Sequence, residues 1–166
     1  AGQSDVPLFA ALARAAERRV GDFKAQELAN TAWAFATVGQ PDAQLFTALA
    51  RTAERRVGEF NAQDLANTAW AFATAGQPDA QLFMALARTA ERRVVEFNAQ
   101  GLANTAWAFA TVNYRDEKLL AALARAAERR LSDFNFNCQK HFSQMVRLHK
   151  ERHQKSAYLG IYTNSK

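Results

Sequence analysis

Cysteine, proline and long apolar runs are scarce in this chain of 166 residues. The single cysteine, Cys138, excludes an intramolecular disulfide and favours a reducing compartment. Three prolines, in a composition rich in alanine, leucine and arginine, favour helix. No apolar run reaches the length of about 18 residues that a membrane-spanning helix needs, so the sequence predicts no membrane insertion.

Motifs of catalysis are also missing. The sequence has no G-x-S-x-G nucleophile elbow, no P-loop and no H-E-x-x-H zinc motif. One set has metal-binding residue types: Cys138, His141, His149 and His153. On a continuous helix, its Cys-His and His-His pairs would lie about 12 Å apart, too far to share one ion. We therefore expect no enzyme, metal, cofactor or small-molecule substrate.

An internal repeat dominates the chain instead. The segment LANTAWAFAT occurs at 28–37, 65–74 and 102–111, and each copy begins 37 residues after the previous one. A fixed period of this length is typical of solenoids, which stack one supersecondary unit and offer a long surface rather than a deep pocket. We therefore predict an all-α solenoid of about 3.5 to 4 helix-turn-helix repeats that binds something extended.

The second repeat illustrates the unit. Pro41 and Asp42 suit the first turn of a helix, because proline lacks an N–H that this turn does not need and a carboxylate complements the helix dipole. Asn61 predicts the N-cap of a second helix, and Asp64 stands where it can complete a capping box. Gly76 fits the left-handed position that ends this helix.

The second helix of each repeat is apolar on nearly every side except a line through Asn67, Ala71 and Thr74, so we expect neighbours on both sides. Aromatic residues at helical spacing on an apolar face normally pack. We therefore assign the tryptophans to the core between repeats; contact of a ring edge with a ligand is the alternative. The tryptophans are Trp33, Trp70 and Trp107.

The first helix of each repeat carries arginines at three constant positions. The first row holds Arg14, Arg51, Arg88 and Arg125, the second row Arg18, Arg55, Arg92 and Arg129, and the third row Arg19, Arg56, Arg93 and Arg130. Periodic guanidinium rows suit the phosphates of a polymer. A salt-bridged face is the alternative, because a glutamate follows each first-row arginine by three residues. These glutamates are Glu17, Glu54, Glu91 and Glu128.

The net charge of +5 arises in the C-terminal part of the chain. Residues 1–134 hold 15 basic and 15 acidic side chains, whereas residues 135–166 hold six basic side chains and Glu151 alone. The repeat region is therefore neutral overall, and the basic C-terminal segment would add affinity for nucleic acid.

We divide the chain into a repeat region at 1–134, a basic capping helix at 135–153 and an extended tail at 154–166. The repeats span about 3–39, 40–76, 77–113 and, in degenerate form, 114–150. We expect a capping helix because the last unit of a solenoid must present a polar outer face to solvent. The tail has an apolar cluster that either folds back or docks into a partner: Tyr158, Leu159, Ile161 and Tyr162. Because the repeat register already includes the first residues, we expect a processed product or a fragment.

The motif F-x-x-Q-x-L-A-N-T-A-W-A-F-A, at 23–36, 60–73 and 97–110, resembles the octotricopeptide and heptatricopeptide repeat families. The resemblance covers roughly residues 2–134. It implies an RNA-binding α-solenoid of a mitochondrion or plastid that acts in RNA stabilisation, processing, translation or ribosome assembly. It also implies that RNA lies on the surface of the first helices.

Two functions follow from these patterns. The first is non-catalytic binding of single-stranded or ribosomal RNA. The second is a structural or adaptor role, with protein docking on the repeat surface and through the apolar cluster of the tail. The predicted RNA-binding residues are Arg14, Arg18, Gln44, Thr47, Arg51, Arg55, Gln81, Arg88, Arg92, Lys118, Arg125, Arg129, Lys140, Arg147, Lys150 and Arg152.

Overall fold

The computed structural model describes residues 6–133, and every structural statement below concerns this part of the chain. It contains seven α-helices joined by tight turns and, within these residues, no strand. The helices are α1 (Val6–Arg19), α2 (Ala25–Thr37), α3 (Ala43–Arg56), α4 (Ala62–Thr74), α5 (Ala80–Arg92), α6 (Ala99–Thr111) and α7 (Glu117–Glu128). The prediction of an all-helical protein is therefore confirmed.

Several predicted features lie outside the described residues. They are the capping helix at 135–153, the tail at 154–166, the set Cys138, His141, His149 and His153, the basic residues Lys140, Arg147, Lys150 and Arg152, and the apolar cluster Tyr158, Leu159, Ile161 and Tyr162.

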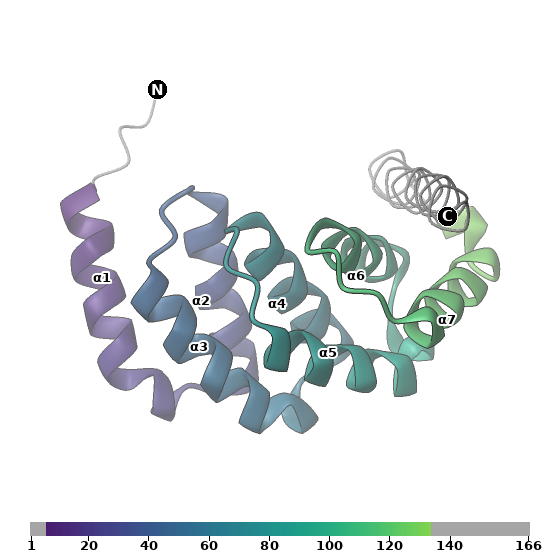
Figure 1. Cartoon of the computed structure of the whole chain (residues 1–166), viewed down its shortest axis with the longest axis horizontal. Coiled ribbons are helices and arrows are strands. Elements are labelled where there is room, and N and C mark those ends of the chain that lie inside the picture. The colour runs from purple at the N-terminus through teal and green to yellow at the C-terminus, as the bar shows by residue number, and fades with distance from the viewer. Residues whose placement is uncertain (1–5, 134–166) are drawn as a thin grey trace, which may run out of the picture.

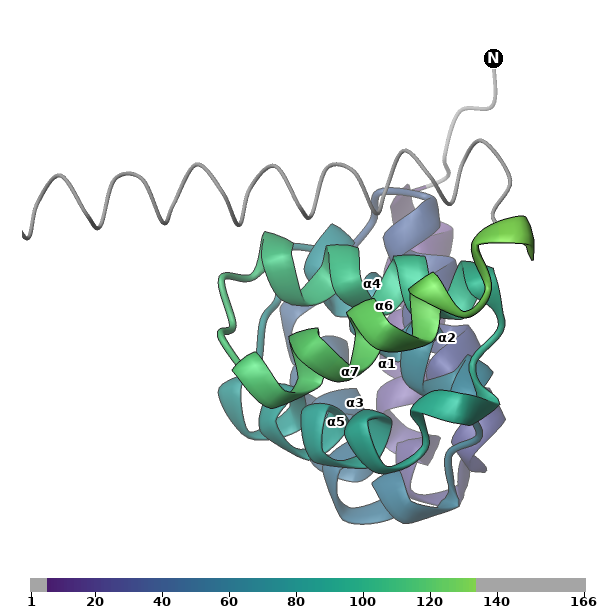
Figure 2. The same ribbon diagram turned by 90° about the vertical axis from the view of Figure 1, so that its right-hand side faces the viewer.

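The helices form two rows. The first helices of successive repeats, α1, α3, α5 and α7, pack side by side in one row, and the second helices, α2, α4 and α6, pack in the other (Figure 1; Figure 2 views the stack from the α7 end). Neighbouring second helices approach each other more closely than neighbouring first helices do. Since the closer row must lie on the inside of a curved stack, α2, α4 and α6 form the inner face (Figure 1).

Side-chain caps begin helices α3 to α7, with one difference from the prediction. Helix α3 begins at Ala43, so Asp42 is the N-cap rather than a first-turn residue, and Pro41 lies outside the helix. The Asp42 carboxylate accepts a hydrogen bond from the backbone N–H of Leu45 at 2.9 Å. Asp79 and Asp116 cap α5 and α7 in the same way. An aspartate is a strong N-cap, and that preference outweighs the fit of proline to the first turn.

The predicted capping box of α4 is confirmed. The Asn61 side chain accepts from the backbone N–H of Asp64 at 2.8 Å, and the Asp64 carboxylate accepts from the backbone N–H of Asn61 at 3.1 Å. Gly76 ends the helix at φ +64°, as predicted, and Asn113 takes the left-handed position after α6 at φ +58°. Asparagine tolerates this conformation better than most residues, which explains how the third repeat manages without glycine.

The core lies between the two rows. Phe46 of α3 meets Phe72 of α4 edge to face, with ring centroids 5.0 Å apart, and Phe83 and Phe109 repeat this contact at 5.1 Å. All four rings are buried. Alanines at the contacts between second helices permit the close approach of the inner row; the buried Ala66 of α4, for example, lies beside Gly101 of α6.

Candidate nucleic-acid interface

The first two arginine rows lie on the outer face and are exposed throughout. All eight side chains, from Arg14 to Arg129, belong to exposed residues of α1, α3, α5 and α7 or the residue that follows α7. The predicted polar neighbours Gln44, Thr47, Gln81 and Lys118 are also exposed. In each helix these positions lie opposite the leucines and phenylalanines of the core, because they fall between the buried positions of a 3.6-residue turn.

The third arginine row has a different environment. The Arg56 guanidinium donates to the Glu59 carboxylate, with a closest contact of 2.7 Å, and Arg93 pairs with Glu96 at 2.6 Å. Arg19 lies 3.7 Å from Asp22 in an exposed pair. These acids lie in the short turns that follow the first helices. Three members of this row are therefore paired with carboxylates of the turns, which fits the salt-bridged alternative with a different set of acids.

The same row also connects successive repeats. Arg56, Arg93 and Arg130 each donate a hydrogen bond to the backbone carbonyl of a phenylalanine 33 residues earlier. These carbonyls belong to Phe23, Phe60 and Phe97. Each carbonyl lies between the two helices of a repeat, where no helical N–H can reach it. The third row therefore acts as a set of clamps between repeats.

The ion pairs shift the ionisation of their members. The hydrogen bond from Arg56 holds the pKa of Glu59 below its ordinary value, and the bond from Arg93 does the same to the pKa of Glu96. The same bonds raise the pKa of each arginine. Both carboxylates therefore stay charged at neutral pH and keep the clamps in place.

The first-row arginines do not form the ion pairs that their sequence spacing allows. Within residues 6–133, the ion pairs closer than 4.0 Å are those of Arg19, Arg56 and Arg93, and none includes Glu17, Glu54, Glu91 or Glu128. Arg55 makes one long contact, 3.4 Å, to the hydroxyl of Thr52. The outer arginines therefore have guanidinium groups available to an anion.

The inner face carries a second repeated pattern, of which our sequence interpretation identified Asn67 and Thr74 correctly and Ala71 wrongly. Each second helix presents glutamine, asparagine, tryptophan and threonine along one line, which we call the inner stripe. Its members are Gln26, Asn30, Trp33 and Thr37 on α2, Gln63, Asn67, Trp70 and Thr74 on α4, and Gln100, Asn104, Trp107 and Thr111 on α6. Ala71, which we expected on this line, is completely buried.

The tryptophans therefore lie at the edge of the core between repeats rather than inside it: Trp70 and Trp107 pack against the buried cluster, whereas Trp33 is exposed. Trp33 is 46% exposed, and Trp70 and Trp107 are half-buried, with ring centroids 6.4 Å apart. In α4 and α6 the alanine after the tryptophan fills the contact between neighbouring helices instead, because a small residue allows the close spacing of the inner row. The signal that could have shown this is the four-residue spacing of Gln63 and Asn67, which places both on one side of the helix.

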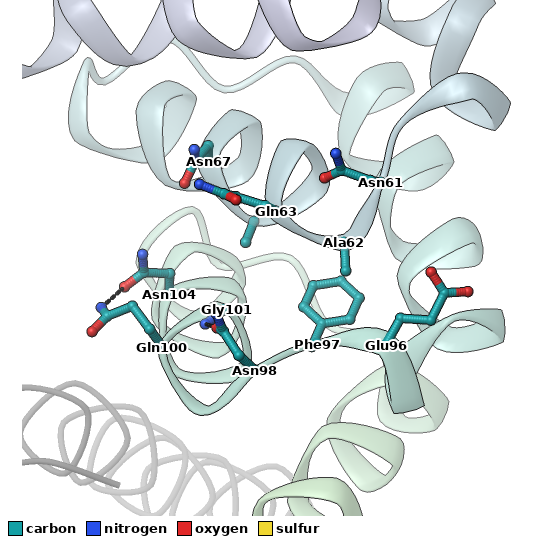
Figure 3. A pocket seen from close by; sticks show the side chains of 11 residues that line it. Asn61, Ala62, Gln63, Asn67, Glu96, Phe97, Asn98, Gln100, Gly101 and Asn104 are labelled. Carbon is teal, nitrogen blue, oxygen red and sulfur yellow. Dashed lines mark hydrogen bonds between the residues drawn. The ribbon is translucent and has the colours of Figure 1, made fainter. Parts of the chain in front are cut away.

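A pocket of about 410 Å³ opens between the first halves of α4 and α6 (Figure 3). Six carboxamides contribute to its eleven lining residues: Asn61, Gln63, Asn67, Asn98, Gln100 and Asn104. Glu96 is the one charged lining residue. Gly101 stands where the preceding repeats have Glu27 and Asp64, and a Cβ there would lie 3.2 Å from the ring of Phe97. Sequence analysis did not find this pocket.

No group of three or more histidine, cysteine, aspartate or glutamate side chains within residues 6–133 is arranged to hold a metal ion. None of the helices in this range is both long and apolar enough to cross a membrane.

Comparison with curated protein sequences gives no match. Among protein families, a model described as RNA-editing substrate-binding complex 6 protein matches residues 5–136. The match agrees with our prediction of a helical protein from an RNA-associated family; it does not show an octotricopeptide or heptatricopeptide repeat, and it gives no support to a plastid. Because it covers most of the chain, the protein belongs to the RNA-editing substrate-binding complex 6 family.

Proposed function

We propose that the protein is a non-catalytic subunit of an RNA-editing substrate-binding complex and grips RNA on its outer face. The observation that carries this proposal is the difference in environment between the arginine rows. Arg56, Arg93 and Arg130 of the third row clamp successive repeats together, whereas the eight arginines of the first two rows are exposed and lack ion pairs within residues 6–133. The family description supports a role with RNA.

A guanidinium surface of this kind suits phosphate for two reasons. Its planar donors match phosphate oxygens, and its charge displaces the counterions that surround a nucleic acid. The spacing of the arginines repeats from helix to helix, as do the charges of an RNA strand. Cooperation between repeats would then supply affinity that a single arginine lacks.

The near-identity of the repeats supports backbone recognition rather than sequence reading. A modular code requires different side chains at equivalent positions, whereas the first-row and second-row residues are arginine in every repeat. Phosphate contacts position a protein on a strand without specifying its bases. We therefore expect little preference among homopolymers.

The proposal extends to features that the described residues do not include. The stack would be an α-solenoid continued by the degenerate fourth repeat and a basic capping helix, and Lys140, Arg147, Lys150 and Arg152 would add contacts to RNA. The compartment would be the mitochondrion, since RNA-editing complexes of this kind are found there.

Fluorescence anisotropy of short single-stranded homopolymer RNAs, titrated with the purified chain at several salt concentrations, tests the proposal. We expect binding that weakens steeply as salt rises. A second titration, without residues 135–166, separates the outer arginines from the C-terminal basic residues. Absence of binding at low salt would reject the proposed function.

A structural or adaptor role is the second candidate, and the description of the family as part of a complex favours it. Under this alternative, deletion of residues 154–166 releases the chain from its complex while RNA affinity is negligible throughout. Retention of the truncated chain in the complex would count against docking through this segment.

A further inference from the structure

We propose that the inner stripe binds an extended polypeptide segment, whose backbone pairs with the carboxamides and whose side chains pack on the tryptophans. This site is distinct from the outer arginines. It rests on the composition of the stripe, on its constancy from repeat to repeat and on the pocket between α4 and α6.

The constancy of the stripe indicates what kind of partner it recognises. Glutamine, asparagine and tryptophan recur at the same positions of α2, α4 and α6. Identical groups at a fixed spacing cannot read a varied series of side chains or bases. They can recognise a unit that itself repeats, which means the backbone of a polymer.

Charge then distinguishes between the two polymer backbones. A nucleic acid requires cations, because phosphate contacts supply most of its affinity. The inner stripe contains no charged residue, and the pocket between α4 and α6 is lined by six carboxamides and Glu96, with no cation. A carboxamide offers both donors and an acceptor, which complements the N–H and C=O of a peptide bond. The composition therefore favours a polypeptide over RNA.

The geometry supports the same partner. Gln63 and Asn67 on α4 face Gln100 and Asn104 on α6 across the pocket (Figure 3). Within residues 6–133 the side chains of Gln63 and Asn67 have no hydrogen-bond partner, and a bond of 2.8 Å from Gln100 orients the Asn104 carboxamide. Packed helices lie about 8–10 Å apart, a distance that an extended chain covers in about three residues. A segment crossing α2, α4 and α6 would therefore meet a new carboxamide about every third residue.

The tryptophans complete the site. Trp70 and Trp107 follow Asn67 and Asn104 by one helical turn, so their half-buried rings border the carboxamides. Such rings offer apolar area with little conformational freedom to lose on binding. Since the chain has only these three tryptophans, all on the inner stripe, their fluorescence reports occupancy of this face.

The test uses the full chain and a phage library of random 12-residue peptides. Peptides selected on the immobilised protein are labelled, and their affinity is measured by anisotropy. We expect that Asn67→Ala with Asn104→Ala weakens binding about tenfold or more, because each side chain can make two hydrogen bonds of about 0.5–1.5 kcal/mol and 1.4 kcal/mol equals tenfold. Peptide binding should also change the tryptophan emission.

A matched control removes the same chemistry from the opposite face. Gln44→Ala with Gln81→Ala deletes two exposed carboxamides of α3 and α5 and should leave peptide affinity unchanged. Alanine favours helix, so both double variants should fold, and circular dichroism checks this.

Three outcomes would overturn the proposal. One is a selection that yields no peptide dependent on Asn67 and Asn104. Another is peptide binding that appears only after deletion of residues 154–166, which would identify the chain's own tail as the occupant. The third is loss of affinity for a uridine 12-mer, rather than for peptide, in the Asn67 and Asn104 variant. Failure of RNA binding alone would reject the proposed function and leave this inference standing.

Discussion

The guanidinium of Arg93 donates a hydrogen bond to the backbone carbonyl of Phe60, which belongs to the preceding repeat. Its other nitrogens bind the carboxylate of Glu96, so one side chain connects two repeats and a turn. Arg56 makes the equivalent contacts to Phe23 and Glu59. The neighbouring arginines one position earlier are exposed. Adjacent arginines therefore have opposite roles, one in cohesion and one on the surface.

Replacement of the clamp should reduce stability. Arg93→Ala leaves the carbonyl of Phe60 without its donor, which we expect to cost about 1–2 kcal/mol. Arg92→Ala, at an exposed position, should stay within about 0.5 kcal/mol of the wild type. Urea denaturation measures both values. Equal stability of the two variants would contradict the division of roles.

The clamps should also make stability depend on pH. The folded-state pKa values of Glu59 and Glu96 lie below their ordinary values, so the stability that these carboxylates contribute is present above the unfolded pKa, about 4.3, and is lost as pH falls through the folded pKa. Thermal unfolding between pH 7 and pH 2.5 measures this. We expect the advantage of the wild type over Glu59→Gln with Glu96→Gln to be constant at neutral pH and to vanish in acid. An advantage that grows in acid would contradict the assigned sign.

The aspartate caps predict a local effect on stability. Asp79→Ala removes the acceptor for the N–H of Leu82 and should lower the free energy of unfolding by about 1 kcal/mol. Gln81→Ala, on the same helix, should have little effect because this side chain is exposed. Chemical denaturation compares the two, and an unchanged slope with denaturant would show that the unfolded state is not altered. A neutral Asp79→Ala would reject this cap as a stabilising contact.

The placement of the tryptophans predicts an optical property. Because Trp33 is 46% exposed and the other two are half-buried, acrylamide should quench the fluorescence of the folded chain. Trp33→Phe should reduce the quenchable fraction most. Emission that is blue-shifted and resistant to quenching would contradict this exposure and indicate that the tryptophans are buried.

The fold could be predicted from the sequence to the extent that local chemistry decides it. The period of 37 residues, the capping box at Asn61 and the turn at Gly76 depend on contacts within one repeat, and each can be recognised from residue types. Even so, Pro41 favoured a helix that begins at residue 41, whereas the cap formed by Asp42 makes α3 begin two residues later, at Ala43. Small differences in free energy decide which of two adjacent residues sets the start of a helix.

The surfaces were harder to predict because they depend on contacts between repeats. The sequence shows three equivalent arginine rows, and only the stacking of repeats directs the third toward a carbonyl 33 residues earlier. Likewise, Ala71 and Trp70 both lie within one turn of Asn67, and the neighbouring second helix decides which of them is covered. The glutamates that follow the first row by three residues suggested ion pairs, but the carboxylates of the turns make the pairs instead.

The most direct test of the proposed function compares the salt dependence of RNA affinity in two variants with the same net charge. Arg51→Gln with Arg88→Gln removes two charges from the outer face, and Gln63→Glu with Gln100→Glu adds two negative charges to the inner face. With a uridine 12-mer, the account predicts that the outer variant flattens the slope of log K against log salt by about 1.4, or 0.7 for each lost phosphate contact. The inner variant should keep the slope of the wild type. An unchanged slope in the outer variant would contradict RNA binding by these arginines.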